Sequence, residues 1–200
     1  MSSLTAVLFT GGESRRMGTD KATLLYQGEP LWSRQLRTLR AIAPDTIFLS
    51  ARNTPPWCPP DVTVILDPPP TRGPLSGLAA ALANIRTTHL LALAVDMPLM
   101  TPEHLCWLQT HLRLGCGVMP VHSGHSEPLC AIYPAQAAEL ATAAMNSHDV
   151  SLHSLVATLR EKHLLTDCLL TEAQLPFYQN FNSPADLTTI TKSSALADLS

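Results

Sequence analysis

The sequence predicts an α/β protein of three layers, in which a mainly parallel sheet lies between two layers of helices. Up to residue 114, short apolar segments alternate with longer segments whose apolar residues recur at helical spacing. The short segments are apolar throughout rather than at every second residue, as in strands buried on both faces of a parallel sheet. Such alternation places helices on both faces of the sheet, and we expect one domain over residues 1–200.

The expected strands of the first half are short apolar runs with turn residues at their ends. The run at 90–95 is the most apolar and is therefore the expected centre of the sheet. A loop is expected at 55–60, which contains four prolines. The four expected strands are 6–10, 46–50, 62–66 and 90–95.

Helices are expected between these strands and in the second half of the chain. Residues 31–42 show apolar positions at helical spacing, and residues 102–114 begin with Thr101 as a candidate N-cap and Pro102 in the first turn. The other expected helices are 75–85, 135–145, 151–162 and 184–192. Further short strands are expected at 117–121, 129–133 and 168–170.

Composition excludes several classes of function. A net charge of −3 and a charged content of 14% argue against general binding to nucleic acid or to anionic membranes. No segment approaches the ~20 apolar residues that cross a bilayer. The five cysteines form no CxxC pair and no zinc-ligand spacing, so reduced thiols and a cytoplasmic location are expected.

Polar residues stand where the first four expected strands end. Gly11 and Gly12 follow the first strand, Ser50 begins the exit from the second, and Asp67 and Asp96 follow the third and fourth. Because ligands of open α/β sheets bind outside the carboxyl ends of the strands, these residues should share one edge. A carboxylate such as Asp96 could hold Mg²⁺ there, together with the phosphates of a substrate. The alternative for each Asp is a turn or a helix cap.

The segment from Gly11 to Lys21 has the composition of a phosphate-binding loop. Its glycines allow close approach of backbone N–H groups, and Arg15, Arg16 and Lys21 can donate charge-assisted hydrogen bonds. It is neither a Walker A loop nor a GxGxxG fingerprint. A glycine-cornered surface loop with solvated basic residues is the alternative. Taken together with Asp96, the loop favours a magnesium-dependent nucleotidyltransferase.

Five motifs in order along the chain resemble those of the molybdenum cofactor guanylyltransferases, which are MobA-like nucleotidyltransferases. The first is Gly11-Gly-x-Ser-x-Arg-Met-Gly-x-Asp-Lys21. The others are Gly28-x-Pro-Leu31, Gly73-Pro-Leu-x-Gly77, Asp96-x-Pro98 and Asn180-x-Asn-Ser-Pro184. Together they span nearly the whole chain.

The resemblance implies a Rossmann-like sheet of the nucleotide-diphospho-sugar-transferase type. It also implies transfer of GMP from GTP to the terminal phosphate of molybdopterin or molybdenum-molybdopterin, with release of pyrophosphate, and molybdoenzyme chaperones as partners. Asp96 would bind Mg²⁺, and Arg15, Arg16 and Lys21 would stabilise charge on the phosphates. The residues implied to contact the nucleotide are Phe9, Thr10, Gly11, Gly12, Lys21, Ser50 and Asp67, and those implied near the acceptor are Asn180 and Asn182.

Two departures from the family pattern concern the nucleotide side. Phe9-Thr10 stand where the family usually has Leu-Ala, and Ser50 stands where it has an Asn that contacts the nucleotide. A cytidylyltransferase for the same cofactor and a sugar-phosphate nucleotidyltransferase are therefore alternatives. Asp20 before Lys21 favours the guanylyl type, because cytidylyl relatives usually carry Pro there. A non-catalytic nucleotide-binding adaptor is a further alternative.

Overall fold

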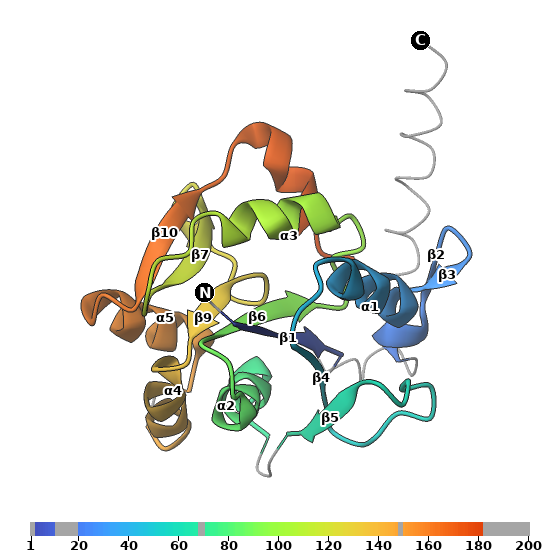
Figure 1. Cartoon of the computed structure of the whole chain (residues 1–200), viewed down its shortest axis with the longest axis horizontal. Coiled ribbons are helices and arrows are strands. Elements are labelled where there is room, and N and C mark those ends of the chain that lie inside the picture. Colours follow the sequence, from blue (N-terminus) through green and yellow to red (C-terminus); the bar gives the residue numbers. More distant parts are fainter. Residues whose placement is uncertain (1–2, 11–19, 68–70, 148–149, 182–200) are drawn as a thin grey trace.

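A mainly parallel sheet forms the middle of the molecule (Figure 1). The computed structural model describes residues 3–10, 20–67, 71–147 and 150–181. Seven strands pair in the order β10-β7-β9-β6-β1-β4-β5, and β8 pairs with β7. Their bounds are β1 Leu4–Phe9, β4 Thr46–Ala51, β5 Thr63–Leu66, β6 His89–Ala94, β7 Gly117–His122, β8 His125–Ser126, β9 Ile132–Pro134 and β10 Leu165–Leu169.

The first four expected strands are present, and the expected parallel pairing is confirmed. Parallel pairing joins β1 to β6 on one side and to β4 on the other, and β4 pairs in parallel with β5. In this register Val7 lies opposite Ala92 of β6 and Phe48 of β4. The most apolar strand, β6, is the middle one of the seven, as predicted.

The strand expected at 129–133 is shorter and runs in the opposite direction to its neighbours. It begins at Ile132 and is antiparallel to both β6 and β7. Backbone hydrogen bonds from Ala92 to Ala131 O and from Ala94 to Leu129 O, both of 2.8 Å, continue the contact with β6 before the strand begins. An apolar run is compatible with either direction, so the sequence does not predict this reversal.

Helices cover both faces of the sheet. The α1 helix (Leu31–Ala41) and α3 (Pro102–Gln109) pack on one face, and α2 (Pro74–Asn84), α4 (Ala137–Met145) and α5 (Leu152–Glu161) pack on the other (Figure 1). Successive side chains of β1 divide between these layers: Ala6 and Leu8 enter the α1–α3 core, whereas Val7 and Phe9 enter the other core. The three-layer arrangement is therefore confirmed.

The third helix ends earlier than predicted. Thr101 caps α3 by accepting a hydrogen bond from the backbone of His104, but the helix stops at Gln109 rather than at residue 114. Leu114 is 99% exposed, so the apolar pattern that extended the prediction does not mark a buried face. A bridge between Arg113 and Cys116, with Gly115 at φ 71°, turns the chain into β7 instead.

Several short elements have no counterpart in the prediction, among them β8, whose two residues carry too little periodicity to be recognised. A hairpin joins β2 (Leu25–Tyr26) to β3 (Glu29–Pro30) through Gln27 and Gly28, both at positive φ. The 3₁₀ segment η2 (Lys21–Thr23) precedes it, and η3 (Glu172–Tyr178) follows β10. The helix expected at 184–192 lies outside the described residues.

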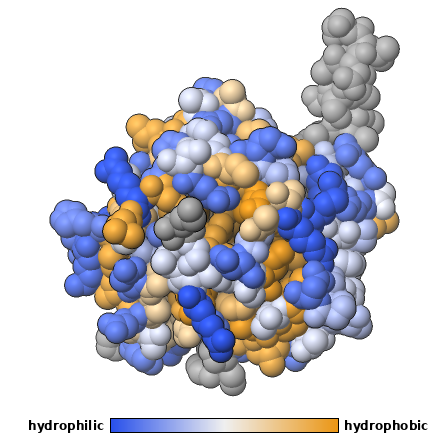
Figure 2. Space-filling model, viewed as in Figure 1, coloured by the Kyte–Doolittle hydropathy of each residue, from blue (hydrophilic) through white to orange (hydrophobic). Residues whose placement is uncertain are grey.

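The basic residues of α1 have defined partners. Arg37 pairs with Glu29 at 2.7 Å and Arg40 with Asp61 at 2.8 Å. Figure 2 shows a hydrophilic area where α1 lies in this view. Each of these arginines is paired with a carboxylate, so the charges on this surface balance. Exposed pairs of this kind contribute little to stability. Among the described residues, no helix is long and apolar enough to cross a membrane.

A buried histidine joins α3 to η3. The His104 ring stacks on Trp107, with centroids 4.9 Å apart, and its Nε2 shares a hydrogen bond of 2.8 Å with the Tyr178 hydroxyl. Burial lowers the pKa of His104 from 6.5 to about 4. Between pH 6.5 and about pH 4 this histidine is protonated in the unfolded chain but neutral in the folded protein. The free energy of unfolding therefore falls as the pH falls through this range.

We expect His104→Gln to weaken this pH dependence. In the native protein this histidine should account for about 2 kcal/mol of the loss in unfolding free energy between about pH 7.5 and about pH 5. Urea denaturation of both proteins at the two pH values measures the difference. The exposed His153→Gln is the matched control and should keep the native pH dependence. An unchanged pH dependence in His104→Gln would contradict the assignment.

Candidate active site

The polar residues predicted to meet do lie along one edge of the sheet. Thr10 follows β1, Asp67 follows β5 and Asp96 lies just beyond β6, at the carboxyl ends of parallel strands. Ser50 is the one difference: β4 continues to Ala51, so Ser50 is within the strand and only 2% exposed. The predicted convergence at this edge is therefore confirmed for the residues that the structure describes.

Hydrogen bonds fix the first two strand ends to each other. The Thr10 backbone and the Thr10 hydroxyl both donate to Ser50 O, at 3.2 and 2.9 Å. On the other side of β1, the Val95 backbone donates to Phe9 O at 3.0 Å. The edge that carries Thr10 is consequently anchored by both neighbouring strands.

Ser50 and Asp67 form a hydrogen-bonded pair beside α2. The Ser50 hydroxyl donates to Asp67 Oδ1 at 2.8 Å, and the Asp67 backbone donates to Ala51 O at 3.0 Å. Gly77 of α2 leaves room for this pair. A Cβ at Gly77 would overlap Ser50 Oγ and would lie 3.0 Å from Asp67 Oδ1 and 3.1 Å from the Phe9 ring. Gly77 is thus a site residue whose role the sequence does not reveal.

Lys21 and Asp96 form an ion pair across the edge. Lys21 Nζ lies 3.2 Å from Asp96 Oδ2, and each side chain is 21% exposed. The N-cap of η2 supports this position, because Asp20 Oδ1 accepts a hydrogen bond of 3.0 Å from the Ala22 backbone. The pair therefore places a cation and a carboxylate together where η2 contacts the loop after β6.

Two side chains of α1 hold the loop that follows Asp96. Arg34 Nε donates to Pro98 O at 2.6 Å, and Gln35 Nε2 donates to Met97 O. Gln35 is fully buried, and its position on the apolar face of α1, between Leu31 and Leu39, is the signal that could have identified it. These contacts from α1 fix the backbone of the loop that follows Asp96.

The segment that follows η3 also holds this loop. The Phe181 backbone donates to Asp96 O at 2.8 Å. Phe181 is buried, with its ring centroid 6.0 Å from that of Tyr26. Its neighbour Asn180 lines a pocket together with Asp96.

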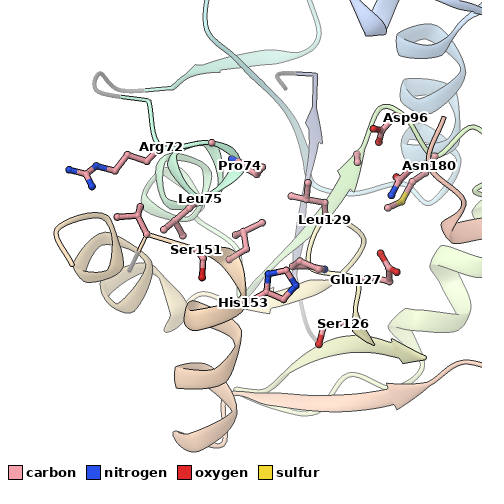
Figure 3. A pocket seen from close by; sticks show the side chains of 16 residues that line it. Arg72, Pro74, Leu75, Asp96, Ser126, Glu127, Leu129, Ser151, His153 and Asn180 are labelled. Carbon is pink, nitrogen blue, oxygen red and sulfur yellow. The ribbon is translucent and has the colours of Figure 1, made fainter. Parts of the chain in front are cut away.

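This pocket encloses about 570 Å³ beside Asp96 (Figure 3). Its walls come from the ends of β6 and β8, the turn at 127–129, and the N-terminal ends of α2 and α5. Leu75, Leu129 and Leu152 supply apolar surface, and Ser151, His153 and Glu127 supply polar groups. A volume of this size suits a small ligand of a few rings.

Several predicted site residues lie outside the described residues, namely Gly11, Gly12, Arg15, Arg16 and Asn182. The described residues of the predicted set form two groups at the same edge of the sheet. Phe9, Thr10, Ser50 and Asp67 make up one group, and Lys21, Asp96 and Asn180 make up the other. Within the described part of the chain, no group of three or more His, Cys, Asp or Glu residues could hold a metal ion.

Comparison with known proteins gives the same assignment along the whole chain. A probable molybdenum cofactor guanylyltransferase of Opitutus terrae is 34% identical over 188 residues, which cover 92% of this chain and 93% of the relative. A molybdenum cofactor guanylyltransferase of Xanthomonas euvesicatoria is 29% identical over 82% of this chain and 88% of its own length.

A solved structure agrees in fold. The molybdopterin-guanine dinucleotide biosynthesis protein A of Archaeoglobus fulgidus superposes with a TM-score of 0.75 at 21% identity, covering 96% of this chain and 98% of that one. The expected nucleotidyltransferase fold is thereby confirmed. The family model described as the MobA-like NTP transferase domain matches residues 6–164. The chain belongs to this family of nucleotidyltransferases.

Proposed function

We propose that this enzyme transfers GMP from GTP to the terminal phosphate of molybdopterin, releasing pyrophosphate. The observation that carries the proposal is the Lys21–Asp96 ion pair at the carboxyl edge of the sheet. Asp96 also lines the pocket to which Asn180 contributes. The names of the O. terrae and X. euvesicatoria relatives support the guanylyl group and the molybdenum cofactor. One domain over residues 1–200 would carry the whole reaction.

The reaction requires positioning and charge neutralisation. An oxygen of the acceptor phosphate attacks the α-phosphorus of GTP, a new P–O bond forms, and the bond to the β-phosphate oxygen breaks so that pyrophosphate leaves. A phosphate monoester has its second pKa near ~6 and is largely dianionic at neutral pH, so it needs no dedicated base. Lys21, with Arg15 and Arg16 from the preceding loop, would stabilise the negative charge on the phosphates.

The donor set at the edge fits Mg²⁺. Mg²⁺ is typically held by one or two carboxylates together with substrate phosphates, and Asp96 offers one carboxylate that is partly exposed at the pocket. Bound there, the ion would supply Lewis-acid neutralisation of the phosphate oxygens. Lys21 pairs with Asp96 Oδ2, so a bound ion would either share this carboxylate with Lys21 or displace it.

The nucleotide base would lie beside β4 and β5. Guanine presents a ring N–H next to an amino group, and a carboxylate can accept both hydrogen bonds. The Ser50 hydroxyl holds Oδ1 of Asp67, so the orientation of that carboxylate is set before a base arrives. Phe9 and Thr10 border the same place from β1. Guanine recognition by Asp67 is thus compatible with Ser50 in place of the family's Asn.

Two other functions remain distinguishable by experiment. A cytidylyltransferase would use CTP in the same site; here Asp20 caps η2, whereas a Pro before Lys21 could not make that hydrogen bond. A non-catalytic adaptor would bind GTP but release no pyrophosphate when molybdopterin is supplied. A cytoplasmic location is proposed because all five cysteines, each within the described residues, are free thiols.

We expect Lys21→Ala and Asp96→Asn each to lower turnover by roughly a hundredfold to a thousandfold, because each removes a charge that acts at the phosphates. Pyrophosphate release with GTP, Mg²⁺ and molybdopterin measures the effect, and circular dichroism checks the fold. The exposed Lys162→Ala and Asp61→Asn are matched controls with expected native rates. Near-native turnover in Lys21→Ala or Asp96→Asn would refute the corresponding role.

Base selectivity is expected to depend on Asp67. With GTP, CTP, ATP and UTP compared at equal concentration, kcat/KM should be highest for GTP. Asp67→Asn should lower kcat/KM for GTP by roughly tenfold to a hundredfold, because an amide donor replaces one of the two acceptor oxygens of the carboxylate. It should change kcat/KM for the other nucleotides little. Asp61→Asn serves as the control. An equal loss for all four nucleotides would argue against base recognition.

We also expect Gly77→Ala to destabilise the protein. Replacing Gly by Ala inside a helix usually stabilises by about 1 kcal/mol, but here the added methyl would displace Ser50 and cost about 1–3 kcal/mol through overpacking. Combining Gly77→Ala with Ser50→Ala removes the overlapped hydroxyl and should recover part of the loss. Urea denaturation of the single and double variants measures this coupling. Native or raised stability in Gly77→Ala would show that the close approach is unimportant.

A further inference from the structure

Two carboxylates of the described residues, Asp96 and Glu127, line the pocket, and only Asp96 has an ion-pair partner. Asp96 is paired with Lys21. Glu127 lies across the pocket from Leu75 and Ser151 in Figure 3, on the side of Asp96 and Asn180. In the described part of the chain, the Glu127 carboxylate accepts no hydrogen bond and forms no ion pair. Both carboxylate oxygens of Glu127 are therefore available to accept hydrogen bonds from a ligand.

The position of Glu127 is rigid and partly buried. Its backbone N–H donates to Pro120 O at 3.0 Å, and its carbonyl accepts a hydrogen bond of 3.0 Å from the Cys130 backbone. Burial raises the pKa of Glu127, although His125 acts in the opposite direction. Partial burial of a carboxylate that accepts no hydrogen bond from the protein is unfavourable, and a ligand with matching donors would offset that cost.

The walls around Glu127 suit a flat ring. Leu75, Leu129 and Leu152 contribute apolar surface to the pocket, so an aromatic heterocycle could be enclosed with its polar edge toward the carboxylate. A carboxylate presents two acceptor oxygens and prefers two adjacent donors. A pterin offers such an edge, because its ring N–H stands next to its amino group.

We propose that Glu127 is a specificity residue that binds the aminopyrimidinone edge of the acceptor's pterin ring in this pocket. The inference rests on the proposed function, which supplies a pterin as acceptor. The geometry then divides the site: Asp67 takes the base of the nucleotide, and Glu127 takes the related edge of the pterin on the far side of Asp96.

Lumazine is the decisive probe, because it is a pteridine in which a carbonyl oxygen replaces the amino group of pterin. It presents one donor and one acceptor to Glu127 instead of two donors. Protein is titrated into dilute pterin or lumazine, and the quenching of pteridine fluorescence gives each affinity. The native protein should bind pterin at least about tenfold more tightly than lumazine, the difference expected for one charged hydrogen bond replaced by repulsion.

The Glu127→Gln variant should reverse this order of preference. Its amide can accept from the ring N–H and donate to the carbonyl oxygen, so it matches lumazine rather than pterin. Glu127→Asp retains both acceptors at a shorter reach, and it should keep the preference for pterin with weaker binding. Glu172 lines only the adjoining pocket, which Glu127 also borders, so Glu172→Gln makes the same chemical change outside the proposed site and should keep the native preference.

Catalysis gives an independent readout. Glu127→Gln should raise KM for molybdopterin by roughly tenfold or more while KM for GTP stays unchanged. Equal affinity of the native protein for pterin and lumazine, undetectable binding of both, or an unchanged preference in Glu127→Gln would overturn the proposal. Absence of pyrophosphate release in the native protein would instead contradict the proposed transfer, whatever the pteridine titrations show.

Discussion

Parallel pairing of β1 with β6 and β4 is the constraint on which the candidate site depends. In a parallel sheet the carboxyl ends of neighbouring strands come out at one edge, so Thr10, Asp67 and Asp96 lie along that edge although long segments separate them in the chain. Hydrogen bonds from Thr10 to Ser50 and from Val95 to Phe9 extend this pairing beyond the regular strands. The strand ends are thereby rigid where a ligand would bind.

The loop after β6 depends on contacts from three elements far apart in sequence. Arg34 and Gln35 of α1 donate to the carbonyls of Pro98 and Met97, and Phe181 donates to the carbonyl of Asp96. These bonds use the backbone of the loop and leave the Asp96 side chain to Lys21. His104 hydrogen-bonds to Tyr178 at the end of η3, three residues before Phe181, which contacts Asp96. Stability of the helical layer and position of the carboxylate are therefore linked.

Sequence patterns predicted the features that follow from burial and from strand order. The apolar runs located β1, β4, β5 and β6, and the residues after them identified the edge. The patterns could not predict the direction of β9, because an antiparallel strand buried on both faces is just as apolar. They extended α3 to Leu114 because apolar spacing alone does not distinguish a buried leucine from an exposed one.

Site residues that act through contacts between distant segments were harder to predict. Gly77 fits a motif of the family, but only its closeness to Ser50 shows why a side chain is excluded. None of the five motifs includes Glu127, and only the structure shows its carboxylate in the pocket that Asp96 also lines. Both depend on distances that a single sequence does not contain.

The order of strands implies where the two substrates would meet. Ser50 and Asp67 lie over β4 and β5, whereas Asn180 and Glu127 line the pocket on the other side, next to β6. Between β5 and β6 there are three strand spacings, roughly 14 Å, with β1 and β4 in between. A nucleotide whose base is near Asp67 must therefore extend its phosphates across β1 toward Asp96 to reach an acceptor in the pocket. Lys21 and Asp96 lie at this crossing point, so under the proposed function one ion pair would act on both substrates.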